Sequence, residues 1–253
     1  MSLTHFSLFS GIGGADLASE WAGFETVGQV EFADYPTKVL EKHWPNVPRW
    51  RDIRDVTGDE IKRVTGLGTV TVLSGGFPCQ PFSVAGKRKG KDDDRFLWPE
   101  MLRVMRELQP TWVIGENVEG LVRMEEFGEI IDNLERSDYE VGTFVVSAYC
   151  SKALFDGKRT FIVATSNNRS ESLRWNRELQ PIEKIEGSRD IDGRRTEEFE
   201  PREWGKIKSR PYGVANGVPS RMDRLKCLGN AIVPQQIYPL FKYIAEIENK
   251  MKN

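Results

Sequence analysis

Cysteine is scarce in this chain of 253 residues, and its few thiols lie far apart in the sequence. Cys79, Cys150 and Cys227 are odd in number and have none of the close spacing of paired ligands. This distribution argues against a disulfide framework and against a four-ligand zinc site. We therefore expect three reduced thiols and no metal.

Long hydrophobic runs are also missing. No apolar stretch approaches the roughly 20 residues that a membrane span requires, and no basic segment followed by an apolar one resembles a secretory signal. We expect a cytoplasmic protein with no membrane partner. The apolar share of 39% is enough to bury a core, and the length allows one large domain or two modest ones.

A strong net charge is absent, since the formal value is only −2. The charges are unevenly distributed, because residues 152–226 carry 17 basic and 12 acidic side chains. Such a segment suits a polyanion, whose phosphates release counterions when lysine or arginine binds. A solvated surface explains the same excess equally well, so charge alone does not define a partner.

Hydrophobic periodicity alternates between two patterns along the first two thirds of the chain. Apolar and β-branched runs predict strands at 5–10, 26–32, 69–74, 111–117, 140–149 and 159–166, and amphipathic spacing predicts helices at 15–23, 35–44, 97–109 and 124–137. This order predicts an α/β fold with a mostly parallel, doubly wound sheet and helices on both faces. The periodicity ends after about Ser166 and returns in a closing helix at 232–251.

The first glycine-rich corner, "FSGIGG" at 9–14, follows a predicted strand. Gly11, Gly13 and Gly14 would let the backbone turn sharply and approach a ligand closely. Glu31 follows the next strand, twenty residues after Gly11, where a carboxylate accepts hydrogen bonds from ribose hydroxyls. The pattern favours a nucleoside site. The dehydrogenase spacing G-x-G-x-x-G is missing, which disfavours a nicotinamide cofactor or a redox enzyme.

The second corner, "SGGFPCQPFS" at 74–83, places Cys79 beyond the same edge of the predicted sheet. Exposed there to peptide dipoles, its thiolate would be a nucleophile, although a half-buried structural thiol fits the residue alone. Glu116 and Asn117 end the following strand. A glutamate at the end of an apolar strand is protonated, paired or used as an acid, unless it merely begins a loop.

Together these motifs resemble a known family. The order "FSLFSGIGG", "VEFADYP", "RDI", "GGFPCQPFSVAGKRKG", "ENVEGL" and "RLKCLGNAIVPQQ" resembles the bacterial and phage cytosine-specific DNA methyltransferases that act on carbon 5. The resemblance covers roughly residues 5–165 and 224–250. It implies a fold of the S-adenosylmethionine-dependent, Rossmann-like type, and methyl transfer to a flipped-out cytosine in double-stranded DNA through a covalent Cys79 intermediate.

The resemblance also implies roles for individual residues. Glu116 would act as the acid at cytosine N3, and Arg159 would hold the edge of the cytosine. For the cofactor, S-adenosylmethionine, it implies binding by Phe9, Gly11, Gly13, Gly14, Glu31, Phe32, Asp52, Ile53, Pro78, Leu97 and Asn230. For DNA it implies a closing loop whose contacts come from Ser83, Lys87, Arg88, Lys89 and Arg95. No metal is implied.

The implied domain organisation has three parts. Residues 1–165 would form the catalytic and cofactor-binding domain, 166–226 a small, irregular target-recognition insertion, and 227–253 a helix that returns to the first domain. The recognition segment is much shorter than is usual in the family, and the common Arg-x-Leu-Thr-x-Arg-Glu motif after it is missing. The target sequence therefore cannot be deduced.

Departures from the family pattern leave alternatives. "FDGKR" at 155–159 replaces the usual Gln-x-Arg-x-Arg and keeps only its final arginine, which leaves room for a non-catalytic DNA-binding member. A tRNA cytosine methyltransferase of the same family would share Cys79 and Glu116. We expect a monomer, with a restriction endonuclease as the other half of its system.

Overall fold

The computed structural model describes residues 2–78, 96–148, 156–167 and 220–252. The described residues belong to two units. Residues up to 167, together with 231–252, form the first unit, and α6 (Arg221–Asn230) belongs to the second. The pocket of the candidate site is lined by residues of the first unit.

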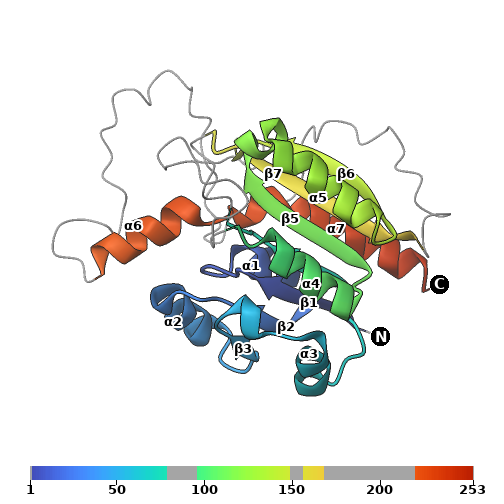
Figure 1. The fold of residues 1–253 in the computed structure, drawn as a ribbon. Coiled ribbons are helices and arrows are strands. Elements are labelled where there is room, and N and C mark those ends of the chain that lie inside the picture. Colours follow the sequence, from blue (N-terminus) through green and yellow to red (C-terminus); the bar gives the residue numbers. More distant parts are fainter. Residues whose placement is uncertain (1, 79–95, 149–155, 168–219, 253) are drawn as a thin grey trace, which may run out of the picture. The chain divides into compact units, whose positions relative to one another are not determined.

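The first unit is built on a seven-stranded sheet with the order β3-β2-β1-β4-β5-β7-β6 (Figure 1). Its strands are β1 (Leu3–Leu8), β2 (Phe24–Val30), β3 (Arg49–Trp50), β4 (Val72–Gly75), β5 (Trp112–Val118), β6 (Tyr139–Val146) and β7 (Arg159–Ser166). The first five strands pair in parallel, whereas β7 is antiparallel to both β5 and β6. The predicted mostly parallel sheet is confirmed.

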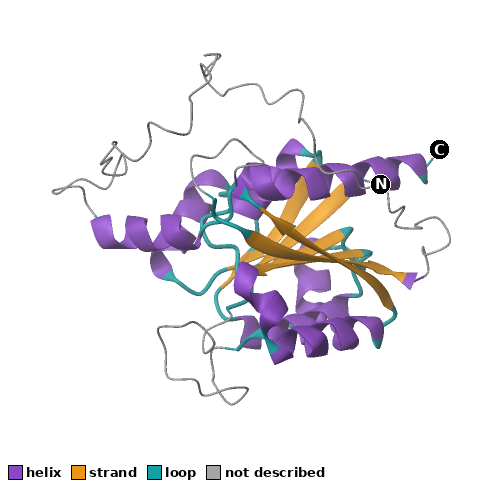
Figure 2. Ribbon diagram, turned by 90° about the horizontal axis from the view of Figure 1, so that it is seen from above, coloured by secondary structure: helices purple, strands orange, loops and turns teal. Residues whose placement is uncertain are grey.

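Helices cover both faces of this sheet (Figure 2). The helices of the first unit are α1 (Gly14–Trp21), α2 (Asp34–His43), α3 (Gly58–Thr65), α4 (Trp98–Leu108), α5 (Glu125–Glu135) and α7 (Pro234–Lys250). α1 packs on α7, while α4 packs on both α3 and α5. The helices divide between the two faces because crossovers between parallel strands are right-handed. From β1 the chain adds strands toward β3, and from β4 it adds them toward β5.

The core consists of apolar residues between the sheet and these helices. Central strands have apolar side chains on both faces, and β1 is buried at every position, as expected for a parallel sheet covered twice. α7 is tied to the sheet by a buried hydrogen bond of 2.8 Å from Trp112 Nε1 to Glu248 Oε1. The end of the chain therefore completes the first unit.

One glycine of the sheet lacks room for any side chain. An added Cβ at Gly28, on β2, would lie 2.3 Å from Cε2 of Phe6, a fully buried ring on β1 that packs against Trp50. The register between β1 and β2 also shifts beside Phe6. Close approach of two strands thus requires glycine at this position.

We predict that Gly28→Ala lowers the free energy of unfolding by about 1–3 kcal/mol, the usual cost of overpacking a core. Gly128→Ala on α5 is the matched control, because its Cβ would meet no atom within 4 Å and alanine favours helix by about 0.5–1 kcal/mol. Urea denaturation of both variants tests this. An unchanged midpoint for Gly28→Ala would show that the strands can separate at low cost.

Candidate active site

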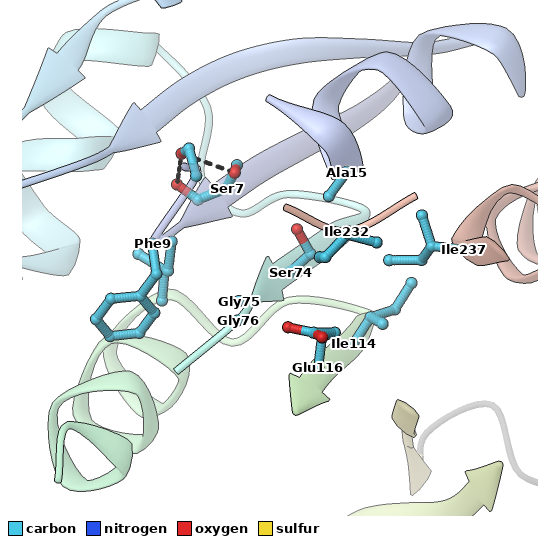
Figure 3. A pocket seen from close by; sticks show the side chains of 12 residues that line it. Ser7, Phe9, Ala15, Ser74, Gly75, Gly76, Ile114, Glu116, Ile232 and Ile237 are labelled. Atoms are coloured by element: carbon cyan, nitrogen blue, oxygen red, sulfur yellow. Dashed lines mark hydrogen bonds between the residues drawn. The ribbon is translucent and has the colours of Figure 1, made fainter. Parts of the chain in front are cut away.

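A small pocket lies beyond the carboxyl ends of β1 and β4, where the winding direction reverses (Figure 3). Open α/β sheets bind ligands at such a switch point. The pocket is lined by Ser7, Leu8, Phe9, Ser10, Ala15, Ser74, Gly75, Gly76, Ile114, Glu116, Ile232 and Ile237. The two isoleucines come from the last part of the chain, so the pocket joins segments more than 200 residues apart.

The glycine-rich turn after β1 forms one wall of the pocket. Phe9 and Gly11 have φ of 53° and 55°, in the left-handed region that L-residues other than glycine rarely adopt. Ser10 N–H donates to Val30 O at 3.0 Å and fastens the turn to β2. An added Cβ at Gly14 would lie 2.5 Å from Ile232 O. The absence of that side chain lets the closing segment approach α1.

Glu31, directly after β2, fixes the same turn. Its Oε2 accepts from Gly11 N–H at 2.8 Å, and its Oε1 accepts from Ala33 N–H at 2.7 Å. A carboxylate offers about four lone-pair sites, so two remain for hydroxyl donors of a ligand. The side chain expected at a ribose therefore also shapes the turn, which the sequence did not indicate.

The residues expected at an adenine differ in exposure. Phe32 is 68% exposed, whereas Ile53 is buried in the core. Asp52 caps the 3₁₀ helix Ile53–Asp55 by accepting from Arg54 N–H at 3.0 Å. Hydrogen bonds from the Arg54 side chain hold the pKa of Asp52 below its ordinary value. Asp52 is thus a charged, anchored carboxylate at this end of the sheet.

Glu116 on β5 is the buried carboxyl group of the site. Its Oε1 lies 2.9 Å from Arg159 Nε on the neighbouring β7. Burial raises the pKa of Glu116 from 4.5 to about 7, although the charge of Arg159 acts in the opposite direction. A carboxyl with a pKa near neutrality can donate or accept a proton at physiological pH. The expectation of a paired or acidic glutamate thus agrees with this geometry.

Asn117, the next residue, reaches the corner that precedes Cys79. Its Nδ2 donates to Phe77 O at 2.9 Å, and its Oδ1 accepts from Val118 N–H at 2.9 Å. The amide therefore links the end of β5 to the chain after β4. Asn117 is a supporting residue whose contact could not be deduced from its place in "ENV" alone.

Several expected site residues cannot be placed in this arrangement. Cys79, Ser83, Lys87, Arg88, Lys89 and Arg95 lie outside the described residues. Pro78 and Leu97, on either side of that segment, are both partly buried, and Leu97 precedes α4 and packs against the core. Asn230 ends α6 in the second unit.

A buried polar network under the glycine-rich turn was missed by the sequence analysis. Asp16 on α1 accepts from Gln29 Nε2 at 3.0 Å and from Ser7 Oγ at 3.2 Å. Ser7 also contacts Ser10 Oγ at 2.8 Å. Burial raises the pKa of Asp16 to about 6, against these hydrogen bonds. Asp16 and Ser19 are both buried on α1 beside two alanines, so no apolar stripe marked Asp16 as an exception in the sequence.

Two further findings concern the described residues only. They contain no group of three or more His, Cys, Asp or Glu side chains arranged to hold a metal ion. In that same part of the chain, none of the helices has the length and apolar character needed to cross a membrane.

Comparison with known proteins defines the family. The model of C-5 cytosine-specific DNA methylases matches residues 3–210, well over half of the chain, and this chain belongs to that family. Type II methyltransferase M.XorII of Xanthomonas oryzae is 34% identical over 142 residues, covering 54% of this chain and 34% of the relative. M.FnuDI of Fusobacterium nucleatum is 33% identical over 161 residues, which cover 62% of this chain and 45% of the relative. The chain thus spans about a third to a half of these curated relatives.

Solved structures agree with the fold. A DNA modification methyltransferase encoded within a prophage of E. coli superposes with a TM-score of 0.58 at 26% identity, covering 67% of this chain and 48% of that chain. A variant of Spodoptera frugiperda DNMT2 superposes with a TM-score of 0.56 at 24% identity, covering 66% of this chain and 51% of that chain. The described sheet thus shares its fold with these solved methyltransferases.

The buried Glu116 predicts a specific dependence of stability on pH. Its pKa is higher in the folded protein, so the stability it contributes is fully present below pH 4.5 and is lost as the pH rises through about 7. Glu116→Gln removes this titration. Relative to the wild type, the variant should gain about 2–3 kcal/mol of unfolding free energy between pH 5 and pH 8, at about 1.36 kcal/mol per pKa unit.

Urea denaturation at several pH values measures this difference. Glu119→Gln, which changes a partly exposed carboxylate three residues away, is the matched control. A constant difference between Glu116→Gln and the wild type across this range would mean that the Glu116 carboxyl is already ionised at pH 5 in the folded protein.

Proposed function

We propose that this protein transfers a methyl group from S-adenosylmethionine to carbon 5 of a cytosine extruded from double-stranded DNA. One observation carries the proposal. The buried Glu116, whose pKa is raised to about 7, lies at the same sheet edge as the Phe77–Pro78 corner. Asn117 ties that corner to β5 through its hydrogen bond to Phe77 O. Cys79 follows Pro78 directly in the sequence, and in this proposal it supplies the nucleophile at the sheet edge where Glu116 supplies the acid.

The chemistry of cytosine explains why both groups are needed. Carbon 5 is a poor nucleophile, and addition of the Cys79 thiolate to carbon 6 makes the ring an enamine-like nucleophile. Glu116 supplies a proton or hydrogen bond at N3, where negative charge would otherwise accumulate. After carbon 5 has gained the methyl group, a base removes its proton, the C6–S bond breaks and the thiolate is restored.

S-adenosylmethionine would supply an electrophilic methyl group on a sulfonium centre, and the residues present fit such a ligand. The turn at Phe9, Gly11, Gly13 and Gly14 leaves open space above Gly11, and Glu31 lies beside it with acceptor capacity for ribose hydroxyls. We assign the adenine end to Phe32, Asp52 and Ile53. Pro78, Leu97 and Asn230 complete the proposed set.

Arg159 would orient both the substrate and the Glu116 carboxyl. Its guanidinium has five donors in a planar fork, of which Nε is directed at Glu116. The remaining donors suit the polar edge of an extruded cytosine, where charge-assisted hydrogen bonds are strong. The neighbouring Lys158 is paired with acidic side chains, because its Nζ lies 3.8 Å from both Glu119 Oε1 and Asp156 Oδ2.

DNA contacts are proposed for the segments outside the described residues. Extrusion of a base costs a few kcal/mol, and a closing loop with Ser83, Lys87, Arg88, Lys89 and Arg95 would bind the backbone and the vacated position. The basic segment 166–226, which follows the catalytic part (1–165) and precedes the closing segment (227–253) in the chain, would recognise the target sequence. Action as a monomer in the cytoplasm, beside a restriction endonuclease, completes the proposal.

We predict that Cys79→Ser abolishes methyl transfer to DNA while leaving S-adenosylmethionine affinity nearly unchanged, because the thiol acts on the base. Transfer of a labelled methyl group measures activity, and calorimetry measures affinity. Cys227→Ser is the matched control, since Cys227 lies on α6 and has no assigned role. Substantial turnover by Cys79→Ser would exclude Cys79 as the nucleophile.

A trapping experiment follows from the same chemistry. DNA with 5-fluorocytosine at the target should form a stable covalent complex with the wild type, because fluorine cannot leave carbon 5 as a cation after methyl transfer. The complex should require both Cys79 and added S-adenosylmethionine, and denaturing electrophoresis detects it. A complex that forms equally well with Cys79→Ser would point to another nucleophile.

For the cofactor, we predict that Glu31→Ala weakens S-adenosylmethionine binding by about 1.5–3 kcal/mol, the value of hydrogen bonds to a charged group. Calorimetry measures the affinity. Glu25→Ala, an exposed position at the other end of β2, should bind as the wild type does. Unchanged affinity in a folded Glu31→Ala variant would contradict the ribose assignment.

A further inference from the structure

Gln236, on the first turn of α7, is a buried residue whose side chain makes two hydrogen bonds to the backbone. Its side chain is 2% exposed. Its Nε2 donates to Val146 O at 2.6 Å and to Gly157 O at 3.0 Å. An amide nitrogen has two hydrogens, so this group uses its full donor capacity on two carbonyls from different parts of the backbone.

Those two carbonyls flank the start of β7. Val146 is the last residue of β6 and pairs with Arg159 in the antiparallel register. Gly157 lies two residues before Arg159 in the chain. A single side chain thus ties the end of one strand to the approach of the next, immediately before the arginine that contacts Glu116.

The other side of Arg159 is fixed by β5, so its backbone has little freedom. Arg159 pairs with Val118, and Thr160 Oγ1 donates to Val118 O at 3.2 Å. The approach from the β6 side, in contrast, is held by Gln236 and by an exposed 2.6 Å hydrogen bond from Ser147 Oγ to Asp156 Oδ1. Because the Gln236 side chain is buried, its two hydrogen bonds compete less with water than the exposed one from Ser147.

We infer that Gln236 is a positioning residue: by holding Val146 and Gly157 it keeps the Arg159 guanidinium against the Glu116 carboxyl and in register with the cytosine edge. The inference rests on the proposed function and adds to it a residue of the closing segment. It explains why a buried amide, costly unless hydrogen-bonded, lies on the first turn of α7. It also gives one residue of α7 a part in positioning Arg159.

The test combines kinetics with a double-mutant cycle. Gln236→Met keeps the length and removes both donors, and Gln235→Met changes a partly buried neighbour of the same type as the control. Methyl transfer to DNA is measured for the wild type, Gln236→Met, Arg159→Gln and the double variant. Calorimetry with S-adenosylmethionine and thermal unfolding are recorded for each, and rates are normalised to the fraction that binds cofactor.

We expect Gln236→Met to lower kcat by on the order of tenfold, because misplacing a reacting geometry by an ångström costs up to about a hundredfold. S-adenosylmethionine affinity should change less than twofold, and Gln235→Met should match the wild type. In the double variant the loss should be close to that of Arg159→Gln alone, since contacts that act through one another are not additive.

Two results would overturn the inference while leaving the proposed function intact: an unchanged kcat in Gln236→Met, or a full additional loss in the double variant. Absence of methyl transfer by the wild type would instead reject the proposed function. If Gln236→Met does not fold, Gln236→Leu, which also lacks both amide donors, enters the same cycle with the same expected outcomes.

Discussion

A carboxyl group buried against one guanidinium is the constraint on which the site depends. Ionised carboxylates are strongly hydrated, and moving one into a protein interior is costly unless it is paired or takes up a proton. Both effects act on Glu116. Burial favours its protonated form and raises its pKa to about 7, while Arg159 at 2.9 Å favours its charged form. The balance leaves an acid and base usable near neutral pH at the end of a rigid strand.

The surrounding backbone is shaped to keep that group in place. Glycine at position 76 leaves space for the carboxyl, because an added Cβ would lie 2.8 Å from Glu116 Oε2. The parallel order of β1, β4 and β5 brings their carboxyl ends to one edge, so the glycine-rich turn and the Phe77–Pro78 corner reach the same place. Ile232 and Ile237 complete the pocket from the other end of the chain.

The elements that the sequence predicted best are those whose periodicity reflects burial on one face. β7 spans the predicted 159–166, and α5 lies within the predicted 124–137. α3 (Gly58–Thr65) was not predicted, because only Gly58 and Ile61 are buried in its eight residues, and so short a helix offers few apolar positions to establish a period. α6 was missed as well, in a stretch where no periodicity was visible.

Candidate site residues could be proposed from the sequence where the chemistry demands a residue type at a strand end, as for Glu31 and Glu116. Their partners could not, because partners depend on tertiary contacts. Nothing local indicates that Glu31 fixes Gly11, that Asn117 reaches Phe77 O, or that Gln236 spans Val146 and Gly157. Left-handed backbone at Phe9 was equally invisible, since it is set by the packed turn rather than by the residue.

Sequencing of DNA at base resolution shows directly whether this chain methylates carbon 5 of cytosine. DNA from cells that express this chain would be compared with DNA from cells that express the Glu116→Gln variant. We expect 5-methylcytosine at a recurring short sequence in the first sample and none above background in the second. Unmodified DNA in both samples, or 5-methylcytosine confined to RNA, would contradict the proposed function.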